Sequence, residues 1–533
     1  MEAIFNLRAI IGKLYSEEKV SIRAYLKLFQ EKGKADTNRG LTLFEYLVTL
    51  ENRKKDIHEI ELAIYKKSNK PALKKLANRT KEKVLEALIL DVNVDRAGVY
   101  SNRTLANIEV RKKLTQAQIL NGRGLRQLAS TMFEKIVDQC MKFELYDELL
   151  TALRILITTR TLEEGRKQLP EMLEQFQKYD YAKNAVMYAE INHRKVVSGN
   201  AFHSDKNINQ KELRDILDGM YEDYVKTDSS QIGFYYYHLE AQNYQQSRDY
   251  LKARKELLNG YRLIQKYDAI NIPNNEIGVL INLADNDLYL SKFDRTFDKA
   301  EEASQLCKSG SFNYEQCIEL MFYAKYYKGE HQIASNILFQ LLPSEDQTTN
   351  FRTGRRSYFL ASTYFMQEDY RTALRWVSLI NPIEADKEGW NLGIKVLQIM
   401  TAIELNEFDD ATAKIDALRK YFENGNGGTN HRAQMINNIF LSLSYNGYNF
   451  KAIYQEQRSL IDMLGERVGE LEWMIKSSEM VIFHQWFVAK ATRQVFTQKV
   501  ISYQLEYEDQ EITNQEMADK KDRNTTDDDP IKQ

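Results

Sequence analysis

The stretch RSYFLASTYFMQEDYRTALRWVSLINP, from Arg356 to Pro382, contains two apolar stripes separated by Gln367-Glu368-Asp369. In each half the apolar side chains recur at i, i+3 and i+4, which indicates one buried face of a helix. Asp369 is placed to cap the second helix, because its carboxylate can accept hydrogen bonds from the free N–H groups of the first turn. Pro382 ends that helix. The stretch therefore predicts a tight pair of antiparallel helices.

The same pattern recurs along the chain. Second helices of this kind are expected to begin near positions 250, 293, 331, 370, 408 and 449. A small residue follows three places into each of them, at spacings of 43, 38, 39, 38 and 41 residues: Ala253, Thr296, Ala334, Ala373, Ala411 and Ala452. A nearly constant period built on a helix pair is the signature of an all-α protein of the α-solenoid type.

The repeated pair resembles the tetratricopeptide repeat (TPR) family. The residues that follow the family's consensus order are Leu360, Ala361, Tyr364, Tyr370, Ala373, Val377 and Pro382. The resemblance covers roughly residues 230–460 and implies a TPR-like superhelix whose first helices line a concave groove. A generic solenoid of helical hairpins is the alternative, because the other repeats match the consensus less well.

Five segments are expected. A basic helical N-terminal region (1–125) precedes degenerate helical repeats (126–229) and TPR-like repeats (230–470). A long C-terminal capping helix (471–512) should cover the last apolar face, as repeat arrays require. The polar stretch 513–533 is predicted to be a disordered acidic tail, because it is too poor in apolar residues to fold.

The composition limits the class of protein. Hydrophobic residues make up 43% and charged residues 28% of the 533 residues, which is typical of a globular chain. The net charge of −2 gives no global attraction to nucleic acid or anionic lipid. Three cysteines without a CxxC pair argue against a disulfide framework. Neither a signal peptide nor a membrane-spanning apolar run is found, so we expect a cytoplasmic protein without a membrane partner.

No motif for catalysis stands out. None of the seven histidines lies three or four residues from another, and HExxH, GxxxxGK, GxGxxG and GxSxG are absent. We therefore expect no catalytic residues, no metal site and no cofactor, and we predict that the chain is not an enzyme.

The resemblance instead points to a groove for a protein or peptide partner. Tyrosine is abundant, with 32 in the chain, and its large rigid ring and hydroxyl suit such a surface. The alternative for each tyrosine is packing in the seam between repeats. The groove positions that the resemblance implies are Tyr235, His238, Gln242, Asp285, Tyr289, Glu319, Tyr323, Tyr326, Tyr327, Tyr358, Ser362 and Phe365.

The leading hypothesis is a non-enzymatic scaffold or adaptor that mediates a protein–protein interaction through this groove. The alternative is a regulator whose repeats sense a ligand and whose basic N-terminal region contacts nucleic acid through residues 66–83. Between Glu51 and Leu125 there are 17 Lys and Arg against 9 Asp and Glu. A solvated helix face, or contact with the acidic tail, would explain the same charges.

Overall fold

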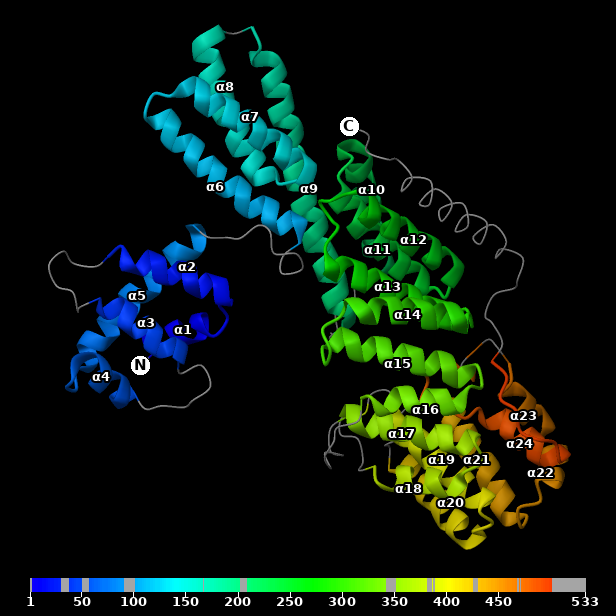
Figure 1. Ribbon diagram of the computed structural model, residues 1–533. Coiled ribbons are helices and arrows are strands. Elements are labelled where there is room, and N and C mark those ends of the chain that lie inside the picture. Colours follow the sequence, from blue (N-terminus) through cyan, green and yellow to red (C-terminus); the bar gives the residue numbers. More distant parts are fainter. Residues whose placement is uncertain are drawn as a thin grey trace, which may run out of the picture. The chain divides into compact units, whose positions relative to one another are not determined.

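Figure 1 shows the computed structural model of the protein, which describes residues 2–29, 38–49, 57–90, 101–165, 167–201, 209–341, 351–380, 386, 389–424, 430–466, 469 and 471–500. All regular secondary structure in these ranges is helical, and they contain no strand. The chain divides into two compact units, Met1–Glu109 and Val110–Gln533. The five domain boundaries expected from the sequence stay a prediction.

The first unit is built around one long helix. Its helices are α1 (Glu2–Ile11), α2 (Ser16–Lys27), α3 (Arg39–Thr49), α4 (Ile57–Tyr65) and α5 (Lys70–Leu90). α5 packs against α1, α2 and α3 with Leu73, Ala77 and Val84, which recur at helical spacing and are fully buried. Leu43 and Phe44 of α3 complete the centre of this core.

The second unit begins within α6 (Asn102–Gly122) and continues with helices that pack on their neighbours in sequence. The degenerate region contains α7 (Arg126–Phe143), α8 (Tyr146–Glu164), α9 (Leu169–Ala201) and α10 (Gln210–Thr227). Six pairs then follow: α11 (Ser230–Gln246) and α12 (Tyr250–Lys266), α13 (Pro273–Tyr289) and α14 (Phe293–Leu306), α15 (Phe312–Tyr327) and α16 (His331–Phe339), α17 (Phe351–Met366) and α18 (Tyr370–Ser378), α19 (Trp390–Glu404) and α20 (Phe408–Glu423), and α21 (His431–Tyr445) and α22 (Phe450–Glu456). The chain continues with α23 (Arg458–Met463) and α24 (Phe483–Thr492). The predicted all-α solenoid of antiparallel helix pairs is confirmed, and Figure 1 shows α11 to α20 stacked in order.

A left-handed residue ends each first helix of the six pairs. These residues have positive φ and are spaced by 43, 38, 39, 38 and 42 residues: Arg248, Ser291, Gly329, Glu368, Asn406 and Tyr448. This conformation stops the helix and turns the chain back. In the pair α17 and α18, Asp369 follows the left-handed residue and caps α18 by accepting from the backbone N–H of Thr372 at 3.1 Å, as predicted.

The small residues lie where the paired helices touch. Ala253, Thr296, Ala334, Ala373 and Ala411 are all fully buried, so the two backbones of the first five pairs can approach closely, whereas Ala452 of the sixth pair is half-buried. Pro382, which the sequence placed at the end of α18, lies outside the described residues, as does the predicted acidic tail.

The expected long capping helix at 471–512 is wrong for the described residues. Residues Leu471–Ile482 form an irregular loop, and only the short α24 follows before a non-helical stretch that reaches residue 500. The loop carbonyls find donors on the repeat array, so this segment has no need of a helix to satisfy its backbone. α24 still covers the end of the array, because Phe483, Trp486 and Phe487 are fully buried there.

Candidate partner-binding surface

The first helices of the six pairs (α11, α13, α15, α17, α19 and α21) form one side of the array, which we call the inner face. Neighbouring first helices are in direct contact; α13 contacts α15, and α17 contacts α19. The predicted groove residues all lie on these helices.

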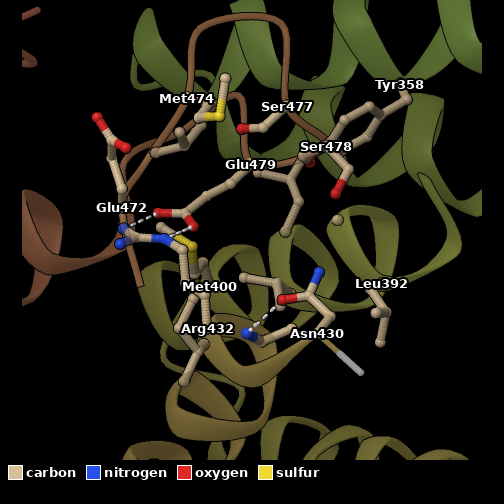
Figure 2. Close-up of a pocket in the computed structure, with 16 residues that line it drawn as sticks. Tyr358, Leu392, Met400, Asn430, Arg432, Glu472, Met474, Ser477, Ser478 and Glu479 are labelled. Atoms are coloured by element: carbon tan, nitrogen blue, oxygen red, sulfur yellow. Dashed lines mark hydrogen bonds and ion pairs between the residues drawn. The ribbon is translucent and has the colours of Figure 1, made fainter. Parts of the chain in front are cut away.

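The inner face already holds a segment of the chain. Residues Leu471–Ile482, which we call the inner loop, turn back on themselves at Met474–Ser477, where the Ser477 N–H donates to the Met474 carbonyl at 3.0 Å. Trp473 Nε1 donates to the Glu479 carbonyl at 2.9 Å and ties the two arms together. Figure 2 shows Met474 and Ser477 on opposite arms of this loop.

Side chains of the inner face donate to the main chain of the inner loop. Tyr358 Oη donates to the Ser478 carbonyl at 2.6 Å, and Tyr326 Oη donates to the Met480 carbonyl at 3.1 Å. Arg432 of α21 donates to the Leu471 carbonyl. Contacts to carbonyl groups are independent of the loop's side chains, as in the recognition of an extended peptide.

Three ion pairs also join the inner loop to the repeat array. Lys476 Nζ lies 2.6 Å from Asp285 Oδ1, and Arg432 lies 2.6 Å from Glu479, as Figure 2 shows for the latter pair. At the turn after α11, Arg248 contacts Glu472. Burial opposes protonation of Lys476, but the charge of Asp285 outweighs it and the pKa of this lysine is raised.

Half of the predicted groove residues are buried. Six side chains are at most 6% exposed: Tyr323, Tyr326, Tyr327, Tyr358, Ser362 and Phe365. They fill seams between first helices or lie against the inner loop; the ring of Tyr323 on α15, for example, packs edge-on against Phe359 of α17 with 5.2 Å between the ring centroids. For these residues the structure favours the packing alternative. Burial also raises the pKa of the Tyr323 and Tyr326 hydroxyls far above the usual value.

The other six predicted residues are half-buried, and three helices supply them: Tyr235, His238 and Gln242 on α11, Asp285 and Tyr289 on α13, and Glu319 on α15. Their part in binding a partner stays a prediction.

A cavity of 340 Å³ brings three predicted residues together. Asp285, Glu319 and Tyr323 line it from α13 and α15. Sequence reasoning missed Arg355 and Lys476, which line the same cavity.

The cavity is strongly charged, with its charges paired. Arg355 lies 2.5 Å from Glu319, and Arg356 lies 2.9 Å from Glu315 and 3.2 Å from Glu319. Arg355 lies three residues before Tyr358 on the same helix, and that i, i+3 spacing is the signal that could have identified it from the sequence. Lys476 had no such signal, because its position depends on how the inner loop folds.

A second cavity of 210 Å³ lies between the inner loop and helices α19 and α21 (Figure 2). Leu392 and Met400 give it apolar walls, while Asn430 and Arg432 are polar. Next to it the loop backbone approaches α19 so closely that a Cβ added at Gly393 would lie 1.9 Å from the Ser478 carbonyl oxygen.

His238 takes part in a hydrogen-bonded pair. Its Nδ1 lies 2.7 Å from Nε2 of His193, and its Nε2 lies 3.3 Å from the Asn282 amide. Burial lowers the pKa of His193 to about 3 and that of His238 to about 4, so both rings are neutral at pH 7. Among the described residues no group of three or more His, Cys, Asp or Glu could hold a metal ion.

The N-terminal unit carries the second candidate surface. Six cationic side chains on and just before α5 are exposed: Lys66, Lys67, Lys70, Lys74, Lys75 and Arg79. They form no ion pair with any described residue. Lys81 and Lys83 of the same predicted stretch are half-buried and pair with Glu82 and Glu86.

No protein-family model and no curated protein matches the chain. Among solved structures it is similar to a signal transduction ATPase with numerous domains (STAND) that has a tetratricopeptide repeat sensor, from Pyrococcus horikoshii. The identity is 13% and the TM-score 0.26; the match covers 87% of this chain and 65% of the other, so the chain spans less than two thirds of that protein. In the part of the chain that the structure describes, no helix is both long and apolar enough to cross a membrane.

Proposed function

We propose that the chain is a non-enzymatic scaffold or adaptor that binds a protein or peptide partner on the inner face of its TPR-like repeats. The observation that supports this most directly is the inner loop, a non-helical segment that the inner face holds by its carbonyl groups. A surface that recognises one such segment has the donors to recognise another. A cytoplasmic location belongs to the same proposal.

The 340 Å³ cavity is the part of the inner face proposed to receive the partner. It lies beside the inner loop and is lined by Asp285, Glu319 and Tyr323, together with the half-buried Gln316. The charged groups around it would select the partner's side chains, because a mismatched charge there would be desolvated without compensation.

The test is a substitution that fills this cavity and leaves every ion pair intact. Peptides selected from a random library against the wild-type chain are measured for affinity to Gln316→Trp and to the control Gln332→Trp. Gln332 is exposed on the second helix α16, away from the cavity. We expect Gln316→Trp to weaken binding about tenfold or more, which corresponds to the loss of one good contact, and Gln332→Trp to leave it unchanged. Equal binding to all three proteins, or no peptide selected, would reject the proposal.

Nucleic-acid binding by the N-terminal unit is the second candidate, and the exposed cations of α5 favour it. Such a surface binds phosphates with an affinity that falls steeply with salt. The full chain is titrated with DNA and RNA duplexes at several salt concentrations, alongside K70E/K74E/K75E and the control K490E, whose lysine lies in the second unit. Loss of affinity and of salt slope in the triple variant alone would support this function, and equal behaviour of the three proteins would reject it.

A further inference from the structure

The inner loop is bound to the array in the way a peptide ligand would be. Three of its carbonyls accept from inner-face side chains, while its own side chains present an acidic, a basic and an acidic group at Glu472, Lys476 and Glu479. Each of these groups forms an ion pair with a residue of opposite charge on the repeats: Arg248 in the turn after α11, Asp285 on α13 and Arg432 on α21. Shape and charge are therefore complementary along the whole segment.

The helix opposite the loop is adapted to this contact. Gly393 lies inside α19, where glycine costs about 1 kcal/mol relative to alanine. Any Cβ there would collide with the Ser478 carbonyl and lie 2.9 Å from the Tyr358 hydroxyl. The inner face thus has a site where an extended backbone approaches a helix at contact distance.

The tip of the loop is held less firmly than its base. Trp473, Met474, Lys476 and Ser477 are half-buried and Ile475 is the one buried side chain of the tip, whereas Met480 to Ile482 are all buried and continue into the core of α24. The Lys476–Asp285 pair is about one third exposed on each side, and such pairs contribute only about 0–1 kcal/mol.

The backbone at the tip also opposes docking. Lys476 has a φ of +64°, a left-handed conformation that costs a residue other than glycine about 1 kcal/mol. The tip can therefore leave the inner face while the base and α24 stay in place.

We propose that the inner loop is a built-in occupant of the partner site, and that the partner is an extended peptide with the same charge order: an acidic residue, a lysine four places later and an acidic residue three places after that. This inference rests on the proposed function and identifies its ligand class. The loop competes with the partner, so the apparent affinity is reduced by the fraction of molecules in which the tip is docked.

The probe is a labelled peptide with the sequence of residues 471–479, and its matched control is the same peptide with Glu472 and Lys476 interchanged. Binding is measured for the full-length wild type, for E472A/K476A, which weakens the loop tip, and for K195A/E212A. The last variant also replaces one glutamate and one lysine, which pair with each other between α9 and α10, far along the chain from the inner loop.

We expect the loop peptide to bind E472A/K476A about tenfold more tightly than it binds the other two proteins, because the peptide regains both ion pairs that the variant's own loop has lost. The interchanged peptide should bind none of them. Adding Asp285→Lys to E472A/K476A should abolish binding of the loop peptide. Equal affinity for all three proteins, or equal affinity for both peptides, would overturn the inference.

Hydrogen exchange keeps the test decisive if E472A/K476A folds poorly. Excess loop peptide should accelerate exchange at the amides of residues 471–478 in the wild type and leave α24 protected. Unchanged exchange under saturating peptide would show that the loop is a fixed part of the fold. If library peptides bind in a Gln316→Trp-sensitive manner while the loop peptide does not, the proposed function stands and this inference alone falls.

Discussion

Gly393→Ala tests how the inner loop is held. In an exposed helix interior this change gains about 1 kcal/mol from helix propensity. Here the new Cβ would lie 1.9 Å from the Ser478 carbonyl oxygen, far inside contact distance, so the carbonyl must move by more than 1 Å, roughly the shortfall from an ordinary carbon–oxygen contact. The 2.6 Å hydrogen bond from Tyr358 would then break.

The expected decrease in the free energy of unfolding follows from the Tyr358 hydroxyl, which is left without its hydrogen-bond partner. The Tyr358 side chain is buried, and a buried hydroxyl left without its partner costs about 1–3 kcal/mol. The matched control is Gly278→Ala in α13, where nothing lies within 4 Å of the added Cβ. Both variants share the gain in helix propensity, so we expect the free energy of unfolding of Gly393→Ala to be lower than that of the control by about 1–3 kcal/mol.

Two assays separate a loop effect from a general one. Urea denaturation followed by far-ultraviolet circular dichroism gives the two free energies of unfolding. Limited trypsin cleavage after Lys476 reports whether the tip has left the inner face. The reasoning is refuted if Gly393→Ala is as stable as Gly278→Ala and its inner loop remains as resistant to trypsin as in the wild type.

Three further predictions concern other polar side chains of the second unit. Tyr326→Phe removes a donor to an inner-loop carbonyl and should destabilise by about 1 kcal/mol in urea denaturation, whereas Tyr445→Phe, at an 82% exposed site, should have no effect. Glu144→Ala should cost about 2–4 kcal/mol, because this buried carboxylate accepts hydrogen bonds from Ser229 and from the first residues of α11; an unchanged melting curve would contradict this. The pKa values of about 3 and about 4 for His193 and His238 lie below the unfolded value near 6.5, so the unfolded state takes up protons first as the pH falls. Stability should therefore decrease from pH 6.5 toward 4 by up to about 1.4 kcal/mol per pH unit for each histidine, and H193Q/H238Q should show a flatter urea-midpoint profile.

The helix pairs could be predicted because their cause is local. Three features act within one or two turns of helix: the apolar spacing, a capping side chain such as Asp369 and a small residue such as Ala373. Each of them can be recognised in the sequence. The period of the array followed from repeating those features. The left-handed residues at the turns were not foreseen, because five of the six are not glycine.

The candidate site could be predicted only as a set of helix faces. Position in a repeat indicates which side a residue faces, and Asp285, Glu319 and Tyr323 do line one cavity. Burial of Tyr326 and Tyr358 was not readable, because it depends on a segment more than 100 residues away in the sequence.

The sequence by itself determined the helices, their pairing and their period, since these depend on neighbours three to forty residues apart. Only the tertiary structure decided what covers the inner face. The segment 471–482 has enough apolar residues to suggest a helix, yet the donors that hold its carbonyls come from α15, α17 and α21. Those donors become available only when the repeats have stacked, so the long-range hydrogen bonds outweigh the local preference.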